Sequence, residues 1–574
     1  MSLKTSPFPQ IPGSTSGKIN LLYKIKNRFS PSDREVKSGL LEKLSKTDID
    51  KAYLLLKYHE SLLFIRAYPD NKDIFDIACR ECNRIYNRVR LLNETDPDEA
   101  VKLEDSGISG TGMYYWYDYS TLYWLLKWYG DTLEINWDEY DNTEGCDNIL
   151  PLISEWVEND GLDLADISTK EWIELRKGSS NKSSLRWFFG NIAKLKSLYL
   201  AKRNLYDSLE LPVVWLLGNT TASRTNAVVP FEKPYFHQDG LMRKIKDFRR
   251  EITKPIPEIK PAPEKTAKMM IKTVRSALAV RHRGLYPIEY ASPDDVLIAE
   301  CGRGYQLVML GMEPEYRLPI ESDYGALILK NGYVIGYGVG AMLFEQVEIA
   351  VNVFDTWRGS EAAFIFAQYV RAFHNQFKCT RFKIERYQVG YDNDEGLKSG
   401  SFWFYYKLGF VPEDIAVRKL AEKELKKINR NPKYRTSIST LKKLALSDMY
   451  YCLKGNPADL PPLPSLANIG MKTTEMIGKR FDGDGKKAVN ICSSELAAIL
   501  RRRGWRKRPR FEKEWFKRLS LIISQIPDLK KWSTEEKKLL YDIMCAKGKP
   551  GETEFVRLMI KHKKLRRAFL KIAN

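Results

Sequence analysis

A run of small residues follows a β-branched segment in the middle of the chain and could bind an anion. Residues 347–354 form the β-branched segment, and the next helix is expected to begin near residue 361. A strand that leads into a helix N-terminus presents unpaired backbone N–H groups and the positive end of the helix dipole. Small side chains allow a pyrophosphate to approach that backbone. The candidate ligand residues are Arg358, Gly359, Ser360, Ala362 and Ala363.

A second candidate site is a cluster of cations near the C-terminus. Residues 501–574 hold 23 Lys and Arg against eight Asp and Glu, which is +15 of the formal net charge of +20. Such clusters contact phosphates without reading a sequence, and a tryptophan among them can stack on a base. An anionic membrane surface and a solvated helical face are the alternative interpretations. The candidate nucleic-acid-binding residues are Arg501, Arg502, Arg503, Trp505, Arg506, Lys507, Arg508 and Arg510.

The elements around the small-residue run predict an α/β fold with a mixed sheet flanked by helices. Residues 264–283 have the spacing of an amphipathic helix, and short strand-like runs follow. Asn331-Gly332 separates two of these runs, as expected of a hairpin turn. Residues 362–377 place apolar side chains on one helical face, and a further strand and a short helix that ends at Gly409 come next. A helix, an antiparallel meander and then strand–helix–strand–helix is an α/β arrangement of limited size.

This order of elements resembles the GNAT N-acetyltransferase superfamily over about 190 of the 574 residues. The family's acyl-CoA loop, Arg/Gln-x-x-Gly-x-Gly/Ala, is partly matched by residues 358–363. Its later signature, Phe-Tyr-x-Lys-x-Gly-Phe, is matched by residues 404–410. The resemblance implies an enzyme that transfers an acyl group, most often acetyl, from acyl-CoA to an amine without a metal. The chain also resembles long bacterial proteins that carry this module behind a helical region.

The same resemblance implies roles for three residues. Tyr405 occupies the position of the tyrosine that protonates the departing CoA thiolate. Glu345 and Glu348 lie before and on the strand that precedes the loop, where members of the family often place the general base. A general base requires a pKa tuned toward neutrality. Aromatic packing for Tyr405, and a solvated or structural role for each glutamate, are the alternatives.

Glu361 departs from the family pattern, which has glycine at this position. Its carboxylate would lie beside the expected pyrophosphate unless the side chain turns away, and stabilising the helix dipole is the ordinary role of such a residue. Two other functions are therefore open. The module could be a catalytically inactive protein that binds nucleic acid or the ribosome, or it could use aminoacyl-tRNA as its donor.

The length of the chain predicts two to four domains. Pro-rich segments mark the expected boundaries on either side of the GNAT-like part, because alternating prolines favour extended linkers. The predicted order is a disordered segment over 1–18, a mainly α-helical domain over 19–253, a linker over 254–264, the GNAT-like acyltransferase domain over 264–455, a linker over 455–470 and a basic helical extension over 471–574.

The composition indicates a soluble, cytoplasmic protein. Eight scattered cysteines are too few for a disulfide scaffold, which fits a reducing compartment. Residues 1–18 contain no apolar signal segment. No stretch approaches the ~20 apolar residues that are needed to cross a bilayer.

Overall fold

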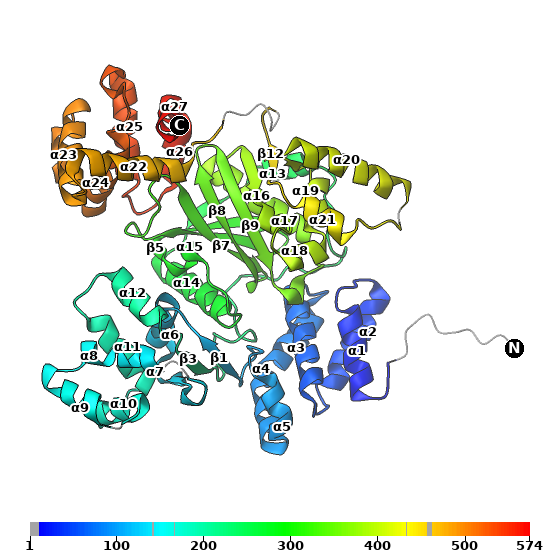
Figure 1. Ribbon diagram of the computed structural model, residues 1–574. Coiled ribbons are helices and arrows are strands. Elements are labelled where there is room, and N and C mark those ends of the chain that lie inside the picture. The colour runs from blue at the N-terminus through cyan, green and yellow to red at the C-terminus, as the bar shows by residue number, and fades with distance from the viewer. Residues whose placement is uncertain (1–10, 141–142, 166, 432, 456–461) are drawn as a thin grey trace. The chain divides into compact units, whose positions relative to one another are not determined.

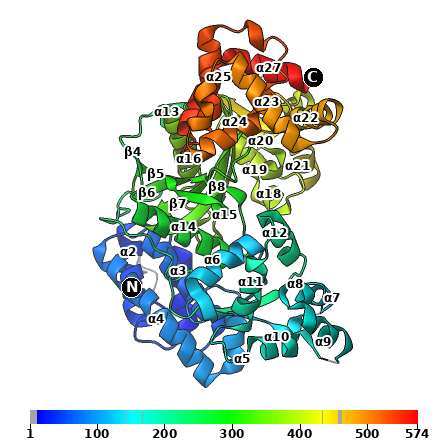
Figure 2. The same ribbon diagram turned by 90° about the vertical axis from the view of Figure 1, so that its left-hand side faces the viewer.

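The protein is a mixed α/β chain that divides into two compact units. The computed structural model describes residues 11–140, 143–165, 167–431, 433–455 and 462–574, without the side chains of residues 143, 144 and 503. Unit 1 comprises Met1–Leu241, Met269–Leu285 and Lys330–Val334, and unit 2 comprises Met242–Lys268, Tyr286–Leu329 and Ile335–Asn574. Figures 1 and 2 show the elements of both. The main break therefore follows residue 241 and not the Pro-rich segment 254–264.

Unit 1 combines helices with a small antiparallel sheet of order β1-β3-β2. Buried side chains such as Leu122, Phe188 and Trp215 form its hydrophobic core. The elements of unit 1 are α1 (Thr15–Ile25), α2 (Pro31–Leu44), α3 (Ala52–Ala67), α4 (Lys72–Thr95), α5 (Pro97–Ala100), β1 (Gly112–Trp116), α6 (Tyr119–Tyr129), β2 (Leu133–Ile135), α7 (Thr143–Asp147), α8 (Leu150–Ile153), α9 (Asn159–Leu164), α10 (Thr169–Lys177), α11 (Ser184–Lys194), α12 (Tyr199–Asp207), β3 (Pro212–Leu216) and most of α14 (Glu264–Ala279).

Helix α1 begins inside the segment 1–18 that the sequence predicts to be disordered. The Ser14 side chain accepts a hydrogen bond from the Gly17 N–H at 3.1 Å and caps the helix. Ile19, Leu22 and Ile25 are buried, so their apolar spacing outweighs the Ser- and Gly-rich composition. Residues 1–10 lie outside the described residues.

Unit 2 is built on a mixed sheet whose nine described strands have the order β11-β12-β10-β9-β8-β7-β6-β5-β4. Strand β10 is parallel to β9 and antiparallel to β12. The strands are β4 (Ile259–Pro261), β5 (Ala291–Gly302), β6 (Tyr305–Met312), β7 (Ser322–Lys330), β8 (Tyr333–Leu343), β9 (Gln346–Val353), β10 (Arg381–Ile384), β11 (Val411–Pro412) and β12 (Met449–Cys452).

The predicted linker 254–264 contains an edge strand. Strand β4 pairs antiparallel with β5, with Lys260 opposite Ile298. Proline is tolerated at such an edge because the outward side of the strand needs no ladder hydrogen bond, which is why Pro261 can stand in β4. The Pro-rich composition thus marks the rim of the sheet in unit 2.

Helix α16 (Ala362–Phe377) connects β9 to β10 and packs on the sheet. Glycines in β8 allow this close approach, because a Cβ at Gly340 would lie 2.2 Å from the Phe373 ring and one at Gly338 would lie 2.9 Å from the Tyr369 ring. The buried face of α16 therefore fixes its N-terminus beside the end of β9.

The remaining helices of unit 2 flank the sheet or follow it, and Figure 2 shows those that follow residue 465, in orange to red, gathered near the C-terminus. No described helix is long and apolar enough to cross a membrane. These helices are α13 (Phe248–Thr253), α15 (Tyr286–Glu289), α17 (Arg386–Val389), α18 (Asp394–Ser399), α19 (Ser401–Lys407), α20 (Ile415–Arg430), α21 (Ile438–Leu444), α22 (Leu466–Phe481), α23 (Gly485–Ile499), α24 (Arg510–Ile523), α25 (Thr534–Ala546), α26 (Thr553–Lys561) and α27 (Lys563–Ala573).

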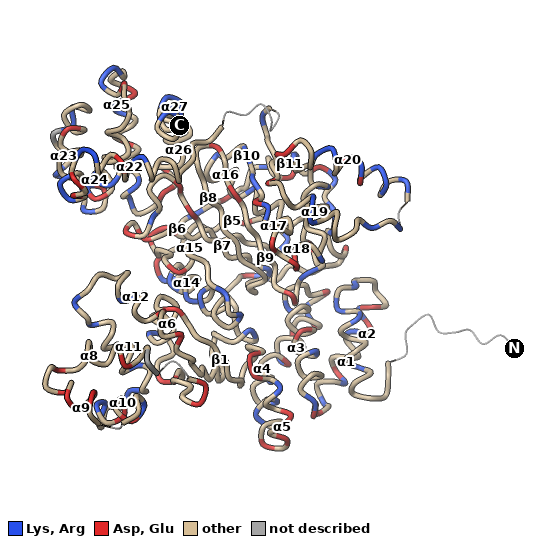
Figure 3. The backbone as a smooth tube through the Cα atoms, viewed as in Figure 1, with Lys and Arg blue, Asp and Glu red and all other residues tan. Residues whose placement is uncertain are grey.

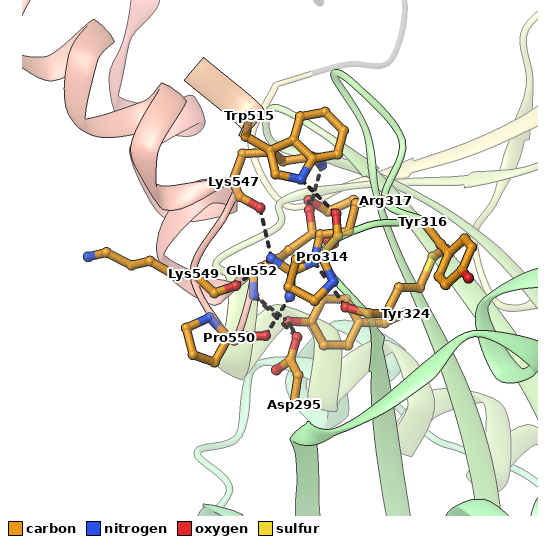
Figure 4. A network of polar contacts seen from close by, with 12 residues as sticks. Asp295, Pro314, Tyr316, Arg317, Tyr324, Trp515, Lys547, Lys549, Pro550 and Glu552 are labelled. Carbon is orange, nitrogen blue, oxygen red and sulfur yellow. Dashed lines mark hydrogen bonds and ion pairs between the residues drawn. The ribbon is translucent and has the colours of Figure 1, made fainter. Parts of the chain in front are cut away.

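A buried polar network joins the α25–α26 turn to the sheet (Figure 4). Lys547 and Glu552 form an ion pair of 2.5 Å, and both side chains are at most 1% exposed. The Arg317 side chain donates to the Lys547 carbonyl at 2.8 Å and lies 3.4 Å from the Glu552 carboxylate. The Tyr324 hydroxyl donates to Asp295 at 2.7 Å. The C-terminal helices are thus part of unit 2 through buried charges as well as apolar contacts.

Two carboxyl groups at this network have raised pKa values. Burial raises the pKa of Asp295 to about 6. Burial, with the nearby Glu321 and Glu552 carboxylates, raises the pKa of Asp323 to about 7. The Oδ1 atom of Asp323 has no hydrogen-bond partner among the described residues.

These shifts predict that stability falls as pH rises from about 4 to about 7. The folded chain keeps the two protons to higher pH than the unfolded chain, whose Asp groups titrate near ~3.9, so deprotonation opposes folding. Asp323→Asn should raise the melting temperature at pH 8 and flatten its pH dependence between about pH 5 and 7. The control is the exposed neighbour Asp294→Asn, which should leave the profile unchanged. Equal profiles for wild type and Asp323→Asn would contradict the assignment.

Candidate functional site

Strand β9 has an open edge in its second half. It pairs with β8 along its whole length, from Gln346 to Val353. On the other side it pairs with β10 only from Gln346 to Glu348. The two parallel strands therefore separate after Glu348, and the backbone of residues 349–353 is not covered by β10.

A hollow of about 350 Å³ lies where β9 and β10 separate. Its walls come from the end of β9, the first turns of α16 and the short helices between β10 and β11. The lining residues are Val351, Asn352, Val353, Arg358, Gly359, Ala362, Ile365, Phe366, Gln388, Asn393, Glu395, Gly396, Ser399, Ser401, Phe404 and Tyr405.

Three of the five predicted cofactor-binding residues line this hollow. They are Arg358, Gly359 and Ala362, whereas Ser360 and Ala363 do not. Gly359 has a φ of +75°, which favours glycine, and nothing lies within 4 Å of where its Cβ would be. Ser360 is 3% exposed and donates to the Trp357 carbonyl at 2.6 Å.

The amino end of α16 supplies backbone donors at this hollow. Among the described residues, no acceptor lies within hydrogen-bond distance of the N–H groups of Gly359, Ala362 and Ala363, as expected at a helix start. Arg358 adds a cation, although its guanidinium pairs with Asp355 at 2.7 Å and with Glu395. The corner thus offers N–H groups to an anion, whereas the charge of Arg358 is already balanced by the two carboxylates.

Glu361 turns away from the hollow. Its side chain is fully buried and is absent from the lining residues. The carboxylate accepts hydrogen bonds from the Met242 N–H at 2.6 Å, from Arg303 at 2.7 Å and from the Tyr305 hydroxyl at 2.8 Å. The negative charge that departs from the family pattern is therefore neutralised on the other side of the loop.

Tyr405 reaches the hollow from α19. It is 6% exposed and packs against Phe366 at 5.3 Å and Phe410 at 5.9 Å between ring centroids. Burial raises its pKa, so the hydroxyl keeps its proton at neutral pH. Tyr405 therefore both packs in the aromatic core and lines the hollow.

Glu345 and Glu348 are not brought to the hollow. Glu345 precedes β9 and Glu348 lies near its start, where the strand is still paired with β10, and neither is a lining residue. Glu348 pairs with Lys383 at 2.9 Å, and Glu345 pairs with Arg566 of α27 at 2.5 Å. Their role as a general base stays a prediction, with both carboxylates held by cations in this structure.

The sequence interpretation missed the wall between β10 and α19. Asn393 caps α18 by accepting the Gly396 N–H at 3.0 Å and also lines the hollow. Ser399 and Ser401 flank the junction of α18 and α19. The preference for asparagine at a helix N-cap is the sequence signal that could have located this wall.

The basic C-terminal cluster differs from the prediction at its tryptophan. Trp505 is 3% exposed and stacks on Phe516 with centroids 4.8 Å apart, so its ring is packed within unit 2 and is not presented to a base. Its apolar ring packs against α24, which carries Phe516. The side chain of Arg503 lies outside the described residues.

The cations of this cluster have varied surroundings. Those that remain exposed are Arg501, Arg506, Lys507, Arg508 and Arg510, while Arg502 is half-buried. Arg508 lies 3.6 Å from Glu512. The Lys and Arg positions around α23 and α24 are marked blue in Figure 3.

Arg501 lines a second hollow, of about 700 Å³, that sequence reasoning did not find. The other cations around it come from three separate helical segments. No continuous stretch of the sequence therefore indicates this hollow. They are Arg480, Lys530 and Lys537.

Within the described part of the chain, no group of three or more His, Cys, Asp and Glu side chains could hold a metal ion.

No protein-family model, curated protein or solved structure matches this chain.

Proposed function

We propose that the hollow between β9 and β10 binds acyl-CoA and that the protein transfers the acyl group, most often acetyl, to an amine. The open edge of β9 carries this proposal. It lies next to the amino end of α16, so one extended ligand can contact both. The pyrophosphate would accept hydrogen bonds from the N–H groups of Gly359, Ala362 and Ala363.

An amide-containing arm suits the open strand edge. Extended chains add to unpaired strand edges through main-chain hydrogen bonds. Residues 349–352 present such an edge beside the hollow, and the Val353 carbonyl beyond them accepts from the Arg358 side chain at 3.1 Å. The arm would lead the thioester away from α16 and along β9. Tyr405, at the wall of the hollow, would donate a proton to the departing thiolate.

The amine acceptor needs a base, and Glu348 and Glu345 remain the proposed candidates. Direct attack within a ternary complex would derive much of its rate from orientation of the two substrates. The ion pairs of both glutamates would have to loosen when the acceptor binds. The geometry favours Glu348 over Glu345, because Glu348 lies on β9 itself.

Ala362→Glu should weaken acetyl-CoA binding by about tenfold or more. Ala362 is exposed in the hollow, and a like charge within about 4 Å costs up to about 4 kcal/mol near a protein surface. An acidic residue in the first turn does not harm a helix, so folding should be retained. Isothermal titration calorimetry with acetyl-CoA measures the effect.

The control for this variant is Ser439→Glu. Ser439 is exposed in the first turn of α21, also in unit 2, so the added charge and its helix position are matched. It should bind acetyl-CoA as the wild type does. Failure of the wild-type chain to bind acetyl-, succinyl- or long-chain acyl-CoA would refute the proposed function.

A polyanion-binding function is the second candidate, and the second hollow, which Arg501 lines, favours it. Four cations from separate segments converge there: Arg480, Arg501, Lys530 and Lys537. Arg480 is held by Glu495 at 2.5 Å. Phosphate contacts of this kind would give binding that weakens steeply with salt.

A further inference from the structure

Unit 1 carries a group of aromatic and cationic side chains where α6 meets α14. The Tyr129 hydroxyl and the Ser276 hydroxyl lie 2.8 Å apart and join the two helices. Trp124 and Trp128, one helical turn apart, stack with centroids separated by 5.4 Å and planes at 26°. Tyr123 contacts Trp124 edge-on at 5.1 Å and is 44% exposed.

This aromatic group is not the core side of α6. Leu122, Leu125 and Leu126 occupy that side and are at most 6% exposed. Trp124 and Trp128 remain partly exposed. Large aromatic rings on the outer side of a helix whose core contacts are already made require another explanation.

Cations surround the rings. Arg275 is 8% exposed and lies 4.3 Å from the Trp124 centroid, which holds that ring in place. The Lys127 Nζ lies 4.8 Å from Trp124, and the Lys272 Nζ lies 4.8 Å from Tyr129.

The two lysines lack counter-anions. Within the described ranges, no carboxylate lies within ion-pair distance of Lys127 or Lys272. Burial lowers the pKa of Lys272, with no acidic neighbour to oppose it. Lys127 is exposed and Lys272 is half-buried. Lysines without acidic partners beside aromatic rings combine the two contacts that single-stranded nucleic acid needs, because bases stack on rings and phosphates pair with cations.

We propose that the α6–α14 aromatic face, formed by Tyr123, Trp124, Lys127, Trp128 and Lys272, binds single-stranded nucleic acid. Bases stack on the exposed rings, and the two lysines contact the phosphates. Duplexes bind less well because their base faces are covered. The base-stacking rings are therefore those of this face and not the buried Trp505. The face is separate from the proposed acyl-CoA site, which lies in unit 2.

The test measures binding of fluorescein-labelled oligouridine and oligo-dT of about 12 nucleotides to the full-length chain by anisotropy. The double variant Trp124→Ala/Trp128→Ala should weaken binding by about tenfold or more. The double variant Lys127→Gln/Lys272→Gln should weaken it and lower the salt slope by about two. Trp116→Ala is the control, since Trp116 is a 44% exposed tryptophan of unit 1 that lies outside α6 and α14.

Heparin and a duplex of equal length separate stacking from simple charge attraction. Heparin has no bases, so the tryptophan variant should bind it as the wild type does, while the lysine variant should bind it less well. Equal affinity of wild type and tryptophan variant for oligouridine, or equal affinity of duplex and single strand, would overturn the proposal. If circular dichroism shows that the tryptophan variant is misfolded, unchanged binding by the lysine variant overturns it instead.

Discussion

Glu552→Gln is expected to lower the stability of unit 2 by about 3–5 kcal/mol, because it leaves buried cations without their carboxylate. Lys547 and Arg317 both contact Glu552, and their side chains are fully buried. Burial already lowers the pKa of Lys547, and the Glu552 carboxylate opposes that shift. Removing the charge would therefore favour neutral Lys547 or opening of the α25–α26 turn.

A chain with two units need not unfold in one step, so the readout should be local. Hydrogen exchange of peptides that cover residues 540–560 reports opening of this turn. Glu552→Gln should speed exchange there strongly. The control is Glu554→Gln, which breaks the exposed Lys549–Glu554 pair and should change stability by about 0–1 kcal/mol. Equal exchange in both variants would show that the network does not hold the turn.

The sequence predicted local elements well where the pattern was self-contained. Asn331 and Gly332 both have positive φ, at +47° and +76°, as a two-residue hairpin turn requires. Helix α16 covers the predicted residues 362–377, because its apolar period is continuous. Tyr405 and the loop of Arg358 and Gly359 lie at one hollow.

Contacts between distant segments could not be predicted in the same way. The direction of the Glu361 side chain depends on Met242, Arg303 and Tyr305, which lie 119, 58 and 56 residues away in the chain. Burial of Trp505 depends on the Phe516 ring. The basic residues around Trp505 suggested an exposed segment. The exposure of the ring is decided instead by its packing on α24.

The pairing of the Pro-rich segment 254–264 with a distant strand could not be predicted from the sequence either. Proline content indicates an extended backbone, and β4 is extended. Whether such a segment is a free linker or an edge strand depends on an available partner, which β5 supplies through pairs such as Pro261 with Leu297. Local conformation was therefore encoded in the composition, and its tertiary pairing was not.

Restoring the glycine of the family pattern by Glu361→Gly is expected to damage the site. The substitution removes one acceptor from the Met242 N–H, the Arg303 guanidinium and the Tyr305 hydroxyl. Breaking a buried, hydrogen-bonded ion pair in this way costs about 3–5 kcal/mol. Because Glu361 precedes α16, the helix start and the Gly359 turn should loosen with it. Acetyl-CoA binding should therefore weaken, although a negative charge has been removed from the loop.

Differential scanning fluorimetry and calorimetric titration with acetyl-CoA measure the two effects together. Glu385→Gly is the matched control, because Glu385 also precedes a helix, is only partly buried, and accepts the Tyr387 N–H at 2.8 Å. Glycine is tolerated at such a position at a cost of a few tenths of a kcal/mol, so both readouts should stay near wild type. A Glu361→Gly protein that keeps its melting temperature and binds acetyl-CoA more tightly would mean that the carboxylate obstructs the hollow. The bonds to Arg303 and Tyr305 would then be incidental to the geometry of the loop.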